Sequence, residues 1–244
     1  MADRREHDLS GEVLRDVVVR GADLRGGGIA DCRLRGVDLW NLEIHGELQN
    51  VVINGVDIAP LVEAELNRRD PERTAMRPET PDGFRRAWEI LERRWAETLQ
   101  RARAMTEARL HEPVGDEWSF IQTLRHLCFA TDAWVGRMVL GDPSPWHPLD
   151  LPWDEAPGWE GIPWDRDARP SLDEVLVLRA GRQAMVREVV ERLTQEQLDD
   201  TVTRTEPGWP QLEDFPVREC LLIVLNEEWE HRSYAERDLA ALDD

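Results

Sequence analysis

Apolar residues divide the chain into an early part with a five-residue period and a later part with helical spacing. In the later part, apolar positions three and four residues apart predict helices over residues 81–105, 120–140, 171–193 and 217–244. Capping residues support three of these starts, because Thr80 precedes a proline and Ser119 and Ser171 each stand three residues before Gln or Glu. The pattern predicts a mainly α domain, a four-helix bundle over residues 80–244.

Residues 1–60 form the early part, in which an apolar residue recurs every five positions. The apolar positions of this series are Leu9, Leu14, Val19, Leu24, Ile29, Leu34, Leu39 and Ile44. Neither a helix nor a strand has this period. The unit from Gly21 to Arg25, with Ala22, Asp23 and Leu24 at its centre, resembles the repeat of the pentapeptide-repeat family. That resemblance implies a short right-handed β-helix before the bundle.

Two long connections interrupt these patterns, one between the two parts and one inside the predicted bundle. Residues 61–79 are polar, contain Pro71 and Pro78, and are expected to form a linker with a short helix. Residues 142–170 contain seven prolines and four tryptophans, and a loop of this length is usually functional or disordered. Because each tryptophan needs a partner surface, we expect an ordered loop that covers one end of the bundle. Its length suits a connection between two parallel helices.

Charge and composition exclude several classes of partner. The formal net charge of −20 argues against nucleic acid and anionic membranes as partners. Three scattered cysteines do not make a disulfide framework and fit a reducing compartment. No run of apolar residues is long enough for a membrane helix. The sequence therefore predicts a cytoplasmic protein with no nucleic-acid and no membrane partner.

The last predicted helix places ionisable residues where apolar ones are expected. Its inward stripe passes through Cys220, Val224, Glu227, His231 and Tyr234. Glu228, one position from Glu227, is expected to face solvent. A carboxylate in a core is costly unless it is paired or binds a metal. Either a buried Glu227–His pair without metal or a metal site would explain the pattern.

Two motifs in the later part resemble the DinB-like superfamily. They are Trp118-Ser119 followed by Thr123-Leu124-Arg125-His126-Leu127, and Glu227-x-x-x-His231. Such bundles typically hold a divalent metal with one His from the second helix and two residues four apart on the last. Most members have His at the first of these two positions. Glu at that position is the variation of the mycothiol-dependent maleylpyruvate isomerase branch.

The resemblance implies that His126, Glu227 and His231 are metal ligands. Two imidazoles and one carboxylate leave a position open for water or substrate. Zinc is favoured, and nickel, iron or manganese would also suit this ligand set.

The implied function is a metal-dependent thiol S-transferase or isomerase that uses mycothiol or a similar thiol on a small electrophile. Candidate pocket residues are Tyr234, Trp146, His147 and Trp153. His147 would alternatively be an exposed loop residue, and the sequence names no general base. The alternative function is a non-catalytic metal-binding interaction module. A homodimer stays an open alternative.

Overall fold

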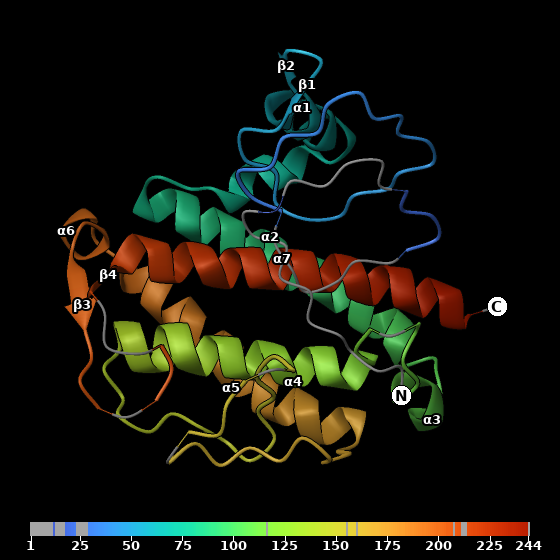
Figure 1. Cartoon of the computed structure of the whole chain (residues 1–244). Coiled ribbons are helices and arrows are strands. Elements are labelled where there is room, and N and C mark those ends of the chain that lie inside the picture. Colours follow the sequence, from blue (N-terminus) through green and yellow to red (C-terminus); the bar gives the residue numbers. More distant parts are fainter. Residues whose placement is uncertain are drawn as a thin grey trace. The chain divides into compact units, whose positions relative to one another are not determined.

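The four long helices predicted from the sequence form the core of the unit Gln49–Asp244 in the computed structural model (Figure 1). They are α2 (Pro81–Ala102), α4 (Phe120–Thr131), α5 (Leu172–Arg192) and α7 (Val217–Leu242). The helix η2 (Asp132–Val139) continues directly from α4, so the second half of one predicted helix is π-helical. The prediction of a mainly α fold is confirmed. The structure describes residues 12, 18–22, 29–115, 117–154, 156–159, 161–206, 208–210 and 214–243.

The helices start at the capping residues that the sequence indicated. The Thr80 side chain accepts a hydrogen bond from the Gly83 N–H at 3.3 Å. Ser119 and Ser171 each form a complete capping box. Because a cap satisfies backbone N–H groups that have no partner inside the helix, these local interactions determine where the helices begin.

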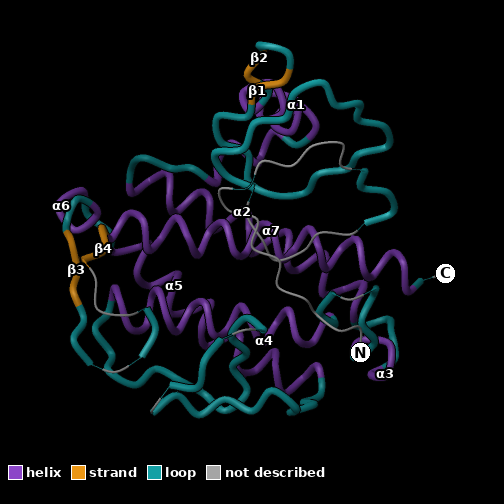
Figure 2. The backbone as a smooth tube through the Cα atoms, viewed as in Figure 1, coloured by secondary structure: helices purple, strands orange, loops and turns teal. Residues whose placement is uncertain are grey.

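The four long helices form a closed ring in the order α2, α7, α4, α5, in which each helix packs against the two beside it. α7 packs against α2 and α4, and α5 packs against the same two helices, so α5 and α7 lie across the centre from each other (Figure 2). Arg218 donates to the Glu79 carbonyl before α2, and Arg101 pairs with Asp243 after α7, so α2 and α7 are parallel.

α4 and α5 are also parallel to each other. Phe120 and Leu172, near their starts, belong to one apolar cluster, and Asp132 pairs with Arg182 further along both helices. This confirms the direction predicted from the length of the 142–170 connection. No helix of the described ranges is long and apolar enough to cross a membrane.

The remaining elements are short. They are β1 (Val52–Ile53), β2 (Val56–Asp57), α1 (Ala59–Arg69), η1 (Pro71–Met76), α3 (Glu107–Leu110), α6 (Gln195–Leu198), β3 (Thr201–Thr203) and β4 (Asp214–Pro216). Asn54 and Gly55, with φ of 51° and 83°, turn the chain between β1 and β2, as an Asn-Gly pair favours. β3 and β4 form an antiparallel pair before α7 that no sequence pattern indicated.

The buried face of α7 is wider than the predicted stripe. Glu228 is 1% exposed and Tyr234 is 43% exposed, so the expected outward Glu228 and inward Tyr234 are both wrong. The physical reason is that α7 packs against two neighbouring helices and the bundle centre, which buries more than one row of side chains. Glu227 lies at the edge of this face, on the side of α4.

In the unit Met1–Leu48, positive φ recurs every five residues over the described residues 31–46. Asp31, Gly36, Asn41 and Gly46 all have positive φ. Residues 18–22 and 29–48 contain no strand, and the apolar side chains of the series are exposed there, from 53% at Leu39 to 79% at Ile29. Leu9, Leu14 and Leu24 lie outside the described residues. The β-helix stays a prediction.

Candidate metal centre

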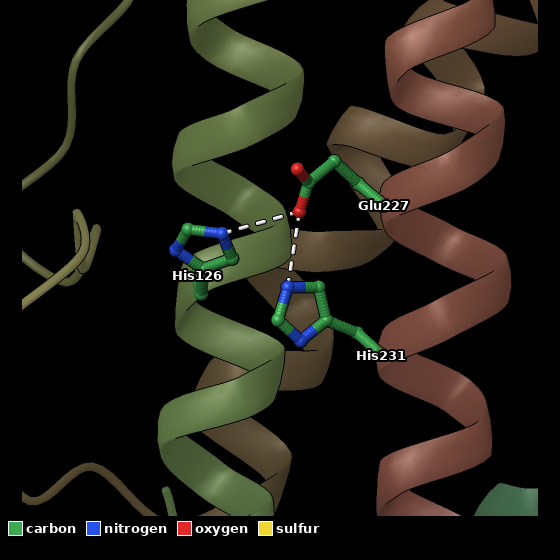
Figure 3. A group of neighbouring side chains, drawn as sticks. All are labelled: His126, Glu227 and His231. Carbon is green, nitrogen blue, oxygen red and sulfur yellow. Dashed lines mark hydrogen bonds and ion pairs between the residues drawn. The ribbon is translucent and has the colours of Figure 1, made fainter. Parts of the chain in front are cut away.

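His126 of α4 and Glu227 and His231 of α7 meet where the two helices pack (Figure 3). Glu227 Oε2 lies 3.3 Å from His126 Nε2 and 3.0 Å from His231 Nε2. One ligand atom from each residue lies within 4.8 Å of the others. We call these three residues the metal-ligand group.

Helix geometry explains this convergence. Glu227 and His231 are four residues apart on α7, so they lie on one side of that helix about one turn from each other. His126 approaches from the facing side of α4. All three side chains keep some contact with solvent, with 10% of His126, 28% of Glu227 and 18% of His231 exposed. The group is thus partly buried, with Glu227 the most exposed of the three side chains.

The second nitrogen of His126 fixes the orientation of its ring. His126 Nδ1 lies 2.9 Å from the Leu151 carbonyl oxygen, which can only accept, so Nδ1 carries the hydrogen. Nε2, the other ring nitrogen, lies 3.3 Å from Glu227 Oε2 and is the atom available to a metal ion. Metal-binding histidines usually donate their other N–H to a carbonyl or carboxylate in this way.

The electrostatics of Glu227 demand a positive partner. Burial raises its pKa, but hydrogen bonds from His126 and His231 outweigh burial and bring the pKa well below its ordinary value. The carboxylate is therefore ionised, and its Oε2 faces two imidazole nitrogens. Either protons on the rings or a cation must lie between these atoms.

The donor set and the spacing fit a divalent metal ion. Zinc takes nitrogen and oxygen ligands at about 2.0–2.2 Å in a tetrahedral arrangement, which places ligand atoms roughly 3.3–3.6 Å apart. The two distances from Glu227 Oε2, 3.3 and 3.0 Å, are close to this spacing. The residues present therefore fit the ion that the motif implied.

Aromatic rings surround the group. Trp118 is stacked on His231 with ring centroids 6.0 Å apart and lies 4.7 Å from the centroid of His126. Its Nε1 donates to Asp154 in the long loop at 3.0 Å. Tyr234 meets the His231 ring edge to face at 5.7 Å. Trp118 and Tyr234 thus flank the imidazoles.

Other predicted pocket residues lie further along the loop. Trp146 and Trp153 both contact Phe129, whose ring centroid is 6.3 Å from that of His126. His147 instead accepts a hydrogen bond from the Leu149 N–H and lines a shallow surface depression with Glu174. The structure brings Trp146 and Trp153 into the aromatic cluster beside the group and gives His147 a different environment.

Arg125 holds the long loop, a role that sequence reasoning missed. Its side chain is 0% exposed and donates to the carbonyls of Leu149 at 2.7 Å, Ala168 at 2.8 Å and Asp165. Because Arg125 precedes His126, the same turn of α4 anchors the loop and presents a ligand. The position of Arg125 inside an otherwise apolar helix segment is the sequence feature that indicates a buried charge with partners elsewhere in the chain.

A second buried polar group ties the loop to η2. Asp132 accepts from Arg182 at 2.7 Å, and its carboxyl group lies close enough to that of Asp150 for the two to share a proton. Both aspartates are 0% exposed. Burial and the charge of Asp132 raise the pKa of Asp150 well above its usual value. We call Asp132, Asp150 and Arg182 the carboxyl cluster.

Comparison with known proteins gives one family. Residues 90–235 match the model of the DinB superfamily, and this range contains all three members of the metal-ligand group. Searches of curated proteins and of solved structures gave no significant match.

Proposed function

Because the chain belongs to the DinB superfamily, we propose that the metal-ligand group binds one divalent ion and that the protein activates a small thiol. The observation that carries this proposal is the convergence of His126 Nε2, His231 Nε2 and Glu227 Oε2 at a partly exposed position. Zinc suits these donors best, with nickel, iron or manganese as alternatives.

The proposed reaction is S-transfer to, or thiol-assisted isomerisation of, a small electrophile. His126, Glu227 and His231 would hold a divalent ion, whose charge would lower the pKa of an adjacent thiol from its ordinary value of about 8.5. In the transfer reaction, the S–H bond breaks and its proton passes to solvent, the sulfur forms a bond to an electrophilic carbon, and the leaving group departs from that carbon with its bonding electron pair. Mycothiol is the thiol that Glu at position 227 favours, through the resemblance to the maleylpyruvate isomerase branch.

The chain's own residues orient and shield the reactants in this proposal. The Leu151 carbonyl holds the His126 ring so that Nε2 faces the open position. Trp118 stacks on His231 and Tyr234 meets the same ring edge to face, so two aromatic rings border the metal-ligand group. Aromatic walls exclude water and favour a thiol or an unsaturated electrophile.

The test begins with metal binding. Purified protein is treated with a chelator, dialysed and titrated with zinc by calorimetry. We expect one ion per chain and at least about tenfold weaker binding for Glu227→Gln, which keeps the size of the side chain. Glu219→Gln removes the same charge at an exposed position of α7 and should bind zinc as the unmodified protein does. No zinc binding, or equal binding by all three proteins, would refute the site.

Catalysis is tested separately on the zinc-loaded protein. Mycothiol and a chromogenic chloronitrobenzene are supplied with and without chelator. Thiol transfer that the chelator and Glu227→Gln both abolish supports the enzyme. Tight zinc binding without turnover of any thiol and electrophile pair favours the alternative, a metal-binding interaction module.

For residues 1–60 we propose a relationship to pentapeptide repeats. The five-residue spacing of positive φ residues between Asp31 and Gly46 supports it, together with the apolar series in the sequence.

A further inference from the structure

Three consecutive residues of α7 contact three different helices. Glu227 contacts His126 on α4, Glu228 binds Arg179 on α5, and Trp229 lies 4.6 Å beneath the guanidinium of Arg94 on α2. Successive helical side chains point about 100° apart, so the three contacts lie around most of the helix. Together they fix the rotation of α7 about its own axis.

The middle contact crosses the centre of the bundle. Arg179 Nη2 donates to Glu228 Oε2 at 2.6 Å, and the two side chains are 1% and 2% exposed. The guanidinium also lies 4.7 Å from the ring centroid of Trp95 on α2. This ion pair therefore joins α5 and α7, the two helices that lie across the centre from each other.

The energetics of the pair favour a geometric role. Arg179 Nε and Nη1 have no hydrogen-bond partner among the described residues, so the buried cation is only partly satisfied. A buried ion pair with incomplete hydrogen bonding often contributes no more stability than apolar residues of the same volume. Its direct effect is to hold one side chain of α7 at a defined place.

We propose that Arg179 and Glu228 are positioning residues for the metal-ligand group, an inference that rests on the proposed metal site. Glu228 is bonded to Glu227 through the backbone, so the place of one carboxylate sets the place of the other. A metal site tolerates only about 0.2 Å of error in its ligand distances. A small rotation of α7 would therefore separate Glu227 and His231 from His126.

The deciding variant is Arg179→Met/Glu228→Leu, which replaces both charges with apolar side chains of similar size. We expect the metal-free variant to unfold at the same urea concentration as the unmodified protein or a higher one. We expect its dissociation constant for zinc, measured by calorimetry, to be at least tenfold weaker. Glu228→Gln keeps the size of the side chain and one acceptor oxygen. Its dissociation constant for zinc should lie between those of the unmodified protein and the double variant.

A matched control removes another ion pair between helices. Glu92→Leu/Arg187→Met breaks a pair joining α2 and α5 nearer the surface and should bind zinc within twofold of the unmodified protein. Equal zinc affinity in Arg179→Met/Glu228→Leu, with unchanged stability, would overturn the positioning role.

A crystal structure of the metal-free double variant keeps this inference separate from the proposed function. We expect Glu227 Oε2 to move beyond its present 3.3 Å from His126 Nε2. If that distance is unchanged, the positioning role fails even where the unmodified protein binds zinc. If the unmodified protein does not bind zinc, the proposed function fails, and this distance still decides the positioning role.

Discussion

The metal-ligand group and the carboxyl cluster both begin on one continuous helical segment, at His126 of α4 and Asp132 of η2, and both reach the same loop. The Leu151 carbonyl accepts from His126, and the carboxyl group of the neighbouring Asp150 interacts with that of Asp132. The carboxyl cluster is closed, with both aspartates fully buried and Arg182 supplying the positive charge. The metal-ligand group is open to solvent and has no such resident cation among the described residues.

This difference separates a group built for stability from one suited to binding. A buried charge with its partner in place resists any change, because removal of one member leaves the other unpaired. A partly exposed carboxylate between two imidazoles can exchange protons for a metal ion at little cost to the fold. We therefore expect mutations in the carboxyl cluster to lower stability and leave metal affinity nearly unchanged. Mutations in the metal-ligand group should lower metal affinity and leave stability nearly unchanged.

The largest effect is expected for Asp132→Leu. Arg182 would remain largely buried without its partner, so the free energy of unfolding should fall by roughly 3 kcal/mol. Zinc affinity of the folded variant should stay within about threefold. Urea unfolding in the presence of chelator measures the free energy of unfolding, and calorimetry measures the zinc affinity. Asp167→Leu, at an exposed loop position, is the control and should change stability little. A small loss for Asp132→Leu would contradict the structural role.

His231→Ala should show the reverse pattern. Removal of one of three ligands should weaken zinc binding at least about a hundredfold. The metal-free protein should lose less than about 1 kcal/mol, because Glu227 stays partly exposed and keeps its contact with His126. Zinc calorimetry and urea unfolding in the presence of chelator measure these two effects. Full zinc occupancy in this variant would rule out the site.

The carboxyl cluster should also give a distinct pH dependence. Burial raises the pKa of Asp132 to about 6, although Arg182 opposes the shift, and the pKa of Asp150 is raised too. The folded state thus binds the shared proton more tightly than the unfolded state. The contribution of Asp132 is complete below the unfolded pKa of about 3.9 and is lost as pH rises through about 6, and the contribution of Asp150 is lost at higher pH.

Asp150→Asn tests this dependence, because its amide carries fixed hydrogens in place of the shared proton. The variant should match the unmodified protein near pH 4 and exceed its free energy of unfolding by at least about 2 kcal/mol at pH 7. Urea unfolding at several pH values with chelator present measures the difference. If the free energies of unfolding of Asp150→Asn and of the unmodified protein differed by the same amount at every pH, Asp132 and Asp150 would not share a proton.

The smallest effect is expected for Trp118→Phe. The phenyl ring can still lie against His126 and His231, and only the hydrogen bond from Nε1 to Asp154 is lost. Stability should fall by about 1 kcal/mol or less, and zinc affinity should stay within about threefold. A tenfold change in zinc affinity would place Trp118 among the residues that position the ligands.

The sequence by itself determined the features that depend on near neighbours. Capping residues such as Thr80, Ser119 and Ser171 marked the helix starts because a cap acts within three residues. The four-residue spacing of Glu227 and His231 placed both on one side of a helix for the same local reason. The motif around His126 supplied the third ligand through a family resemblance.

Only the tertiary structure decided how α7 is rotated and what its charged residues meet. A single apolar stripe along α7 predicts that Glu228 faces solvent. In the structure it is paired with Arg179, on the helix across the bundle. Asp132 and Asp150 gave no sequence signal, since their shared proton depends on the path of the loop. Burial and charge pairing between segments far apart in the chain follow from packing, which no local pattern encodes.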